Sequence, residues 1–257
     1  ITYQGGDGDD LALIASTESP NTFSDGVVNL STLNGTTGYR LDGARSGDST
    51  GGYVGTTGDI NGDGFEDFLI GAEQAQPDGQ PFQGAVYVVF GKGDEFEKSF
   101  DLGSLDGTNG FRLDGAESND FLGASNFAGD VNNDGIDDLV VGASGAGSGG
   151  RAYVIYGSNE EFPASLDVDT LDGTVGVQFD AADIGEQAGW SVKFAGDVNG
   201  DGIDDLLIAT RRGTPASGSF DEGEVYVVFG QNGSFNHPFD LGTLDGSNGF
   251  ILEGVDE

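Results

Sequence analysis

The chain has 257 residues, of which 48 are glycine and none is cysteine, so it is long enough for a sizeable core but has no disulfide or thiol chemistry. Its 45 acidic residues outnumber the 9 basic ones and give a formal charge of -36, which excludes nucleic acid as a natural partner because phosphates would be repelled. No apolar run approaches the roughly 18 residues that a membrane span needs, and the abundance of glycine disfavours helices.

The N-terminal part, residues 1–44, predicts an incomplete repeating unit. Residues 9–15 have the pattern of the end of an acidic loop followed by an apolar strand. Residues 27–30 read as a shortened strand and residues 33–43 as a further one. The strand that should open this unit is missing, and its loop is too short to align with the loops described below, so no metal ligand is assigned in residues 7–10.

The first complete unit, residues 45–115, contains an acidic loop at residues 59–67. Oxygen-bearing side chains occupy positions 1, 3, 5 and 9 of this loop, and a glycine at position 6 allows a sharp turn, as Ca²⁺ requires of a short loop. The backbone carbonyl of position 7 can add a further oxygen. Position 12 is Ile70, where an EF-hand has a bidentate Glu, so the EF-hand and the related dockerin motif are excluded.

The same loop returns in the two units that follow, residues 116–180 and 181–257, as residues 130–138 and 197–205. Asp, Asn and Gly are also ordinary turn residues, so one copy alone could be an acidic turn without a metal. Three copies with the same oxygens favour ligation, because three carboxylates in so short a loop repel one another unless a cation is present. We therefore expect about three Ca²⁺ ions. The expected ligands are Asp59, Asn61, Asp63, Phe65 (carbonyl), Asp67, Asp130, Asn132, Asp134, Ile136 (carbonyl), Asp138, Asp197, Asn199, Asp201, Ile203 (carbonyl) and Asp205.

Short apolar segments around each loop predict strands. In the first complete unit they are residues 68–72, 84–91 and 110–115, rich in branched and aromatic side chains and bounded by glycine. A segment of small residues before each loop supplies a fourth strand. Four antiparallel strands per unit predict the blades of an all-β β-propeller, with three complete repeats and a partial N-terminal one. The sequence leaves open whether these units close a small ring or form an arc of a longer array.

These features together resemble the FG-GAP repeat of integrin α-subunit propellers and their bacterial calcium-binding relatives. The residues that carry the resemblance are 196–202 (Gly-Asp-Val-Asn-Gly-Asp-Gly) with two near copies, Gly-Ala at 71–72 and 142–143, and Phe-Gly at 90–91 and 229–230. The pattern departs at residues 209–210, where Ala-Thr replaces Gly-Ala. The resemblance implies calcium loops on one face of a propeller whose faces and rims recognise proteins or glycans. The same family includes lectins and propellers attached to enzymes.

Residues suited to catalysis are few. The only histidine, His237, lies in a polar connection, and the chain has no nucleophile elbow, zinc signature or phosphate loop. Paired carboxylates are expected by chance among 45 acidic residues, so we expect no enzyme. Arg211 and Arg212 are the only adjacent basic pair; they could contact an acidic partner or another copy of the chain, but local ion pairs are favoured. For Trp190, packing in the core is favoured over stacking on a sugar.

The expected function is that of an extracellular, calcium-stabilised β-propeller that acts as a binding or adhesion module for protein or glycan partners. Two alternatives remain: a structural subunit of a surface fibre or layer built by stacking of repeats, and a carbohydrate-binding, lectin-like propeller. A location outside the cell is expected because calcium loops of modest affinity are filled most readily where Ca²⁺ is millimolar.

Overall fold

The computed structural model describes residues 10–13, 34, 38–94, 96–212 and 223–254, and this part of the chain forms four β-sheets. The first sheet has three strands and the order β1-β2-β6. Its strands are β1 (Asp10–Leu13), β2 (Tyr39–Asp42) and β6 (Ser99–Asp101). The expected strand at residues 27–30 lies outside the described residues, whereas β1 and β2 lie where the sequence predicts strands.

The second and third sheets have five strands each, in the orders β11-β7-β5-β4-β3 and β16-β12-β10-β9-β8. Four strands of each sheet are antiparallel and come from a single unit, as expected for a blade. The strands of the second sheet are β3 (Tyr53–Gly58), β4 (Asp67–Ala72), β5 (Ala85–Val89), β7 (Gly110–Asp114) and β11 (Ser165–Asp167). Those of the third are β8 (Ala124–Gly129), β9 (Asp138–Ala143), β10 (Arg151–Ile155), β12 (Gly176–Asp180) and β16 (Phe239–Asp240).

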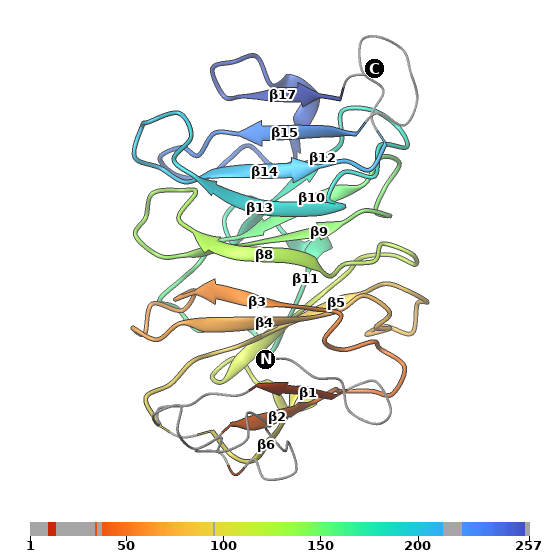
Figure 1. Cartoon of the computed structure of the whole chain (residues 1–257), viewed down its shortest axis with the longest axis vertical. Coiled ribbons are helices and arrows are strands. Elements are labelled where there is room, and N and C mark those ends of the chain that lie inside the picture. The colour runs from red at the N-terminus through yellow and green to blue at the C-terminus, as the bar shows by residue number, and fades with distance from the viewer. Residues whose placement is uncertain (1–9, 14–33, 35–37, 95, 213–222, 255–257) are drawn as a thin grey trace, which may run out of the picture.

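The fourth sheet has four antiparallel strands in the order β13-β14-β15-β17. They are β13 (Ser191–Gly196), β14 (Asp205–Ala209), β15 (Glu224–Val228) and β17 (Gly249–Glu253). Figure 1 shows the four sheets one after another along the long axis, with β3, β8 and β13 as neighbours and the first and fourth sheets at opposite ends. The described residues therefore form an open arc of blades. No helix in this part of the chain is long and apolar enough to cross a membrane.

The fifth strand of the second and third sheets is borrowed from the next unit, which the sequence did not predict. After β10 the chain adds β11 in parallel to β7 of the preceding sheet, passes through the 3-10 helix η4 (Val168–Thr170) and returns to form β12 in its own sheet. The pairs β6 with β2 and β16 with β12 repeat this parallel addition. The sequence predicts only a polar connection between the third and fourth strands of each unit. In the structure this connection contains β6, β11 or β16 and joins consecutive blades through backbone hydrogen bonds.

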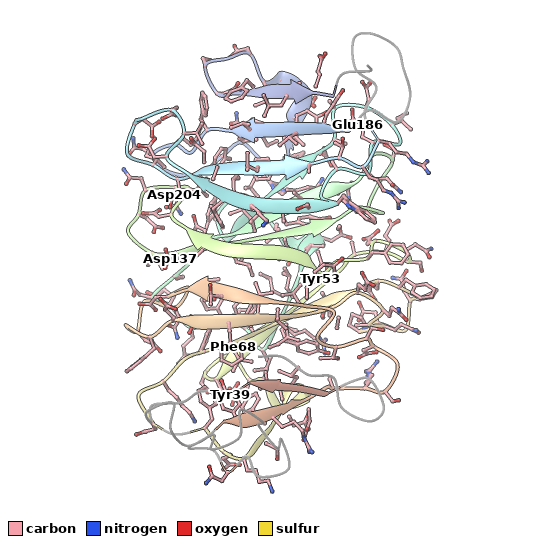
Figure 2. The ribbon with its side chains drawn as sticks, viewed as in Figure 1. Tyr39, Tyr53, Phe68, Asp137, Glu186 and Asp204 are labelled. Carbon is pink, nitrogen blue, oxygen red and sulfur yellow. The ribbon has the colours of Figure 1, made fainter. Side chains whose placement is uncertain are left out.

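The hydrophobic core lies between successive sheets. Strands β5, β9 and β10 are buried along nearly their whole length, which explains their continuous apolar sequences, because strands covered on both faces do not alternate with polar residues. Between the first two sheets, the ring of Tyr39 stacks on Phe96 at 4.3 Å between centroids and lies near Phe68 (Figure 2). The packing of sheet on sheet is thus the main apolar contact of the described residues.

Candidate calcium-binding loops

Each acidic loop connects the first strand of a blade to the second. In the second sheet the loop follows β3, and its last residue, Asp67, is the first residue of β4. A register shift interrupts the pairing of β3 with β4 just before the loop, and similar shifts interrupt the pairs β8 with β9 and β13 with β14. All three loops therefore leave their strands through a bulge, which turns the chain out of the sheet.

The first loop is folded around its own side-chain oxygens. The carboxylate of Asp59 accepts the N–H groups of Asp63 and Gly64 at 2.9 and 2.8 Å. The amide oxygen of Asn61 accepts the same Asp63 N–H at 3.0 Å, and Asp63 accepts the N–H of Phe65 at 2.9 Å. Gly64 has a φ of +91°, which favours glycine, so position 6 has the role that the sequence predicts.

The second and third loops repeat this arrangement residue by residue. In the second loop, Asp130 accepts the N–H groups of Asp134 and Gly135 at 3.1 and 2.8 Å. In the third, Asp197 accepts those of Asp201 and Gly202 at 2.9 Å each. The three loops therefore hold equivalent carboxylates in equivalent positions.

The carboxylate at position 9 is buried and links the loop to the end of the third strand. Asp67 accepts the N–H of Ile60 at 3.0 Å and that of Gly91 at 2.7 Å, and only 1% of its surface is exposed. Its equivalents do the same: Asp138 accepts from Gly157 at 2.9 Å, and Asp205 accepts from Gly230 at 2.9 Å. The glycine that closes each third strand is therefore conformationally coupled to the loop.

Burial of these carboxylates disfavours their charged form. Burial is the largest cause that raises the pKa of Asp67 to about 7 and that of Asp138 to about 8, and the neighbouring carboxylates at positions 1 and 5 of each loop contribute to the same rise. The hydrogen bonds that these groups accept from backbone N–H lower the pKa by less. A cation beside each loop would offset both effects by favouring the ionised carboxylates.

The donor set of each loop fits a hard divalent cation. Three carboxylates, one amide oxygen and one backbone carbonyl are the oxygen ligands that Ca²⁺ prefers. A carboxylate oxygen that accepts one N–H keeps a further lone pair for a metal. Within the described residues, no group of three or more His, Cys, Asp or Glu side chains is close enough to hold a metal by itself, so ligation would also draw on the amide and carbonyl oxygens. The fifteen ligands named above stay a prediction.

A further carboxylate, at position 8, links consecutive loops, a role that the sequence pattern did not predict. The carboxylate of Asp137 in the second loop accepts the N–H of Asp59 in the first at 3.0 Å. Asp204 in the third loop accepts the N–H of Asp130 in the second at 3.1 Å. Figure 2 shows Asp137 and Asp204 at the same loop end of neighbouring sheets. A local signal is the glycine before each of the first two loops, because a Cβ at Gly58 would lie 2.0 Å from the Asp137 carboxylate and one at Gly129 would lie 2.9 Å from that of Asp204.

The next blade also covers the first two loops. The carbonyl of Ile60 accepts the N–H of Ser158 at 2.9 Å, and the carbonyl of Val131 accepts that of Gln231 at 3.0 Å. The side chains of Ile60 and Val131 are fully buried, whereas 51% of the equivalent Val198 in the third loop is exposed. Within the described residues, the first two loops therefore belong to blade interfaces.

Two side chains outside the loops, Trp190 and His237, have surroundings that the sequence did not predict. Trp190 is not a core residue: 49% of it is exposed, and the guanidinium of Arg211 lies over its ring at 4.5 Å. Trp190 precedes β13 instead of lying in it, and the cation–π contact replaces the packing expected for it. The Nδ1 atom of His237 accepts the N–H of Gln178 at 3.2 Å, a structural contact between neighbouring units.

Comparison with known proteins places this geometry in a family. FG-GAP repeats match residues 51–89, 122–155 and 188–228, which contain the three loops and the strands around them. The chain is 32% identical over 168 residues to phosphatidylinositol-glycan-specific phospholipase D of Mus musculus, covering 62% of this chain and 18% of that protein. It is 29% identical over 195 residues to integrin alpha pat-2 of Caenorhabditis elegans, covering 70% of this chain and 14% of that protein. It is 28% identical over 195 residues to integrin alpha-5 of Xenopus laevis, covering 72% of this chain and 16% of that protein.

The chain thus spans less than a fifth of the length of these relatives. What it shares with them includes the repeats, and the matched repeats contain the three loops and the first three strands of each blade. The chain therefore contains three FG-GAP repeats within an all-β fold of successive propeller blades.

Proposed function

We propose that the chain is an extracellular, calcium-stabilised β-propeller module that binds a protein partner. The observation that carries the proposal is the shared geometry of the three loops: each gathers oxygen ligands, each is tied to its own blade by a buried position-9 carboxylate, and two are tied to the next blade. The integrin relatives support a role in recognition, and secreted or cell-surface relatives support a location outside the cell.

In this proposal the residues of the chain hold the loops, and the cation supplies the positive charge that offsets the repulsion among their carboxylates. Positions 1, 3 and 5 (Asp59, Asn61 and Asp63 in the first loop) orient their oxygens through hydrogen bonds to the loop backbone. Asp67 transmits the loop conformation to the third strand through Gly91, and Asp137 transmits it to the next blade. Occupied loops would thereby rigidify the arc of blades that presents the binding surface.

The phospholipase D relatives do not make an enzymatic role part of the proposal. They are enzymes by name, but the shared region is the FG-GAP part and covers only 18% of the mouse protein. The integrin relatives contain the same repeats without an enzymatic name. We therefore propose a binding module, without a catalytic residue.

The test is thermal unfolding in about 2 mM Ca²⁺, a concentration of extracellular order, beside a sample in excess chelator, with light scattering recorded on both. A higher Tm in calcium without particle growth is expected, because binding to the folded state alone stabilises it by mass action. A rise accompanied by assembly would instead favour the fibre or layer subunit. An unchanged Tm would contradict the role of calcium.

A further inference from the structure

One turn of the repeat carries an apolar residue where its sister turns carry an asparagine. In the turns before β7 and β17, the amide oxygens of Asn109 and Asn248 each accept a backbone N–H at 3.0 Å, from Asp106 and Asp245. The side-chain amides of the two asparagines also donate to backbone carbonyls at 3.3 and 3.2 Å. In the turn before β12 the equivalent residue is Val175, which makes none of these bonds and is 46% exposed.

The backbone of this turn nevertheless matches its sisters. The carbonyls of Asn109, Val175 and Asn248 accept the N–H of the residue after the third strand at 3.1, 3.1 and 3.0 Å. The fold therefore tolerates either residue type, and the asparagine adds turn-closing hydrogen bonds that Val175 lacks. An exposed valine that replaces them is a candidate contact residue.

Val175 lines the wall of a cavity of about 410 Å³ at the loop end of the third sheet. The cavity is lined by residues of the second acidic loop and of the segment 158–163, and its lining is mainly apolar, with Tyr156, Phe162 and Leu166 beside Val175 among the lining residues. The walls are fixed: the hydroxyl of Tyr156 accepts the N–H of Phe235 at 3.0 Å, and Phe162 stacks on Phe111 at 4.6 Å between ring centroids. A preformed apolar hollow of this size is typical of a ligand site.

The mouth of this cavity is acidic. Glu160 and Glu161 are exposed at its edge, and no Lys or Arg lines it. The equivalent hollow beside the preceding blade is smaller, at about 250 Å³, and its large apolar side chains are limited to Phe90 and Phe162. Glu160, Glu161 and Phe162 line both hollows, so the larger apolar interior is what distinguishes the hollow beside Val175.

We propose that this cavity binds an apolar side chain, preferably aromatic, of a protein partner in which a Lys or Arg stands next to it. The apolar group fills the hollow against Val175 and Tyr156, and the basic group lies beside Glu160 and Glu161. Charge complementarity selects a cationic neighbour over an anionic one. The inference deepens the proposed function. It rests on that function in one respect, namely that the partner is a protein. Asn132 and Asp134 of the second acidic loop also line the cavity, but the negative charge on which the proposal rests is that of the two glutamates.

The test uses two matched probes, the acetylated and amidated dipeptides Phe-Lys and Phe-Glu, titrated into isotope-labelled full chain and followed by NMR. The Phe-Lys peptide is expected to shift the methyl signals of Val175 and Leu166 and to bind in the millimolar range. The Phe-Glu peptide is expected to bind roughly tenfold more weakly, because its charge is repelled by the glutamates. Equal binding of the two peptides, or shifts confined to other residues, would overturn the proposal.

Variants separate the two halves of the site. Val175→Asn restores the sister turn, so the fold is expected to keep or gain stability while the affinity for Phe-Lys falls roughly fivefold through lost apolar contact. Ile184→Asn, at an apolar residue that is 81% exposed elsewhere, is the matched control and should change neither. The double variant Glu160→Gln, Glu161→Gln should abolish the preference for Phe-Lys over Phe-Glu. Undiminished affinity of Val175→Asn would refute the site.

The two proposals fail separately. If the chain shows no calcium-dependent Tm while the Phe-Lys preference and its loss in the variants persist, the calcium part of the proposed function is wrong and the cavity site stands. If the Tm responds to calcium and both peptides bind alike, the site is wrong and the calcium-stabilised module stands.

Discussion

At the scale of single residues, the carboxylates of one loop have different roles although they lie within nine positions. Asp134, at position 5, is exposed and accepts only the N–H of Ile136 and an amide hydrogen of Asn132, at 2.9 Å each. Asp138, at position 9, is fully buried and accepts from two backbone groups in different segments. Removal of the Asp134 carboxylate should therefore weaken cation binding, and removal of the Asp138 carboxylate should also destabilise the fold.

The variant Asp134→Asn tests the first of these roles. The new amide oxygen can still accept the N–H of Ile136, but the charge is lost, so the Tm gained in calcium should fall while the Tm in chelator stays within about 2 °C of the parent. Differential scanning calorimetry in both conditions gives the answer. An equal loss of Tm in calcium and in chelator would show that Asp134 supports the turn rather than a cation.

One cross-strand pair of charged residues differs between the third and fourth sheets, and the difference predicts that stability depends on pH. In the third sheet Arg151 faces Asp180 across the strands and pairs with it at 2.9 Å, whereas in the fourth sheet the equivalent Glu224 faces Glu253. Glu224 also lies 3.2 Å from the hydroxyl of Tyr226, which is 3.0 Å from the carboxylate of Glu186. One hydroxyl hydrogen cannot serve both carboxylates, so one of the two is left without that hydrogen bond at any moment.

Burial, followed by neighbouring carboxylates that include Asp183, raises the pKa of both Glu186 and Glu224 above the usual value of 4.5. Stability from such groups is fully present below about pH 4.5 and is lost as the pH rises through the folded-state pKa. Glu224→Gln should therefore raise the Tm at pH 8, by roughly 2 to 4 °C, and change it little at pH 4.5. Glu97→Gln, at an exposed position, is the control, and an equal effect of Glu224→Gln at both pH values would disprove the assignment.

At the scale of elements, the loops and the borrowed strands join each blade to its neighbour from two sides. The parallel pairing of β11 with β7 joins two sheets at their outer edge, and the bond from Asp59 N–H to the Asp137 carboxylate joins them near the inner strands. Each of the first two acidic loops is therefore held partly by the blade that follows it. We expect from this arrangement that the calcium affinity proposed for one loop depends on a residue of the next.

The variant Asp137→Ala should lower the calcium affinity of the first loop about fivefold, since one hydrogen bond of about 1 kcal/mol that orients Asp59 is lost. The amide signal of Gly64, followed by NMR during calcium titration, reports on this loop, and that of Gly135 reports on the second. Asp137→Asn, which keeps an acceptor oxygen, should restore the affinity. Glu66→Ala, at the same position of the first loop and exposed, is the control. A change at Gly135 alone would contradict coupling between blades.

At the scale of the whole molecule, the blades form an arc in which the coverage of the loops is unequal (Figure 1). The second residue of the first two loops is fully buried under the following blade, whereas Val198 of the third loop is half exposed. Since a loop held from two sides loses less conformational entropy on binding, the third loop should be the weakest of the three sites. A calcium titration should saturate Gly64 and Gly135 before Gly202, and the reverse order would contradict this account.

The sequence by itself determined the features that depend on neighbouring residues. Oxygen ligands with a glycine at position 6 specify a loop whose hydrogen bonds span two to seven residues, so the geometry around Asp59 and Asp130 follows from local chemistry. Apolar runs as short as β9 specify buried strands in the same way. The blades, their order and the three candidate loops could therefore be predicted from local sequence patterns.

Only the tertiary structure decided how the blades are joined and what they expose. The bond between Asp59 and Asp137 links residues 78 positions apart, and the addition of β11 to β7 depends on the register between two units, which no local pattern encodes. The exposure of Trp190 and the cavity beside Val175 likewise follow from which surfaces the neighbouring segments cover. Local spacing sets the geometry of a loop, whereas burial and contact are properties of the packed chain.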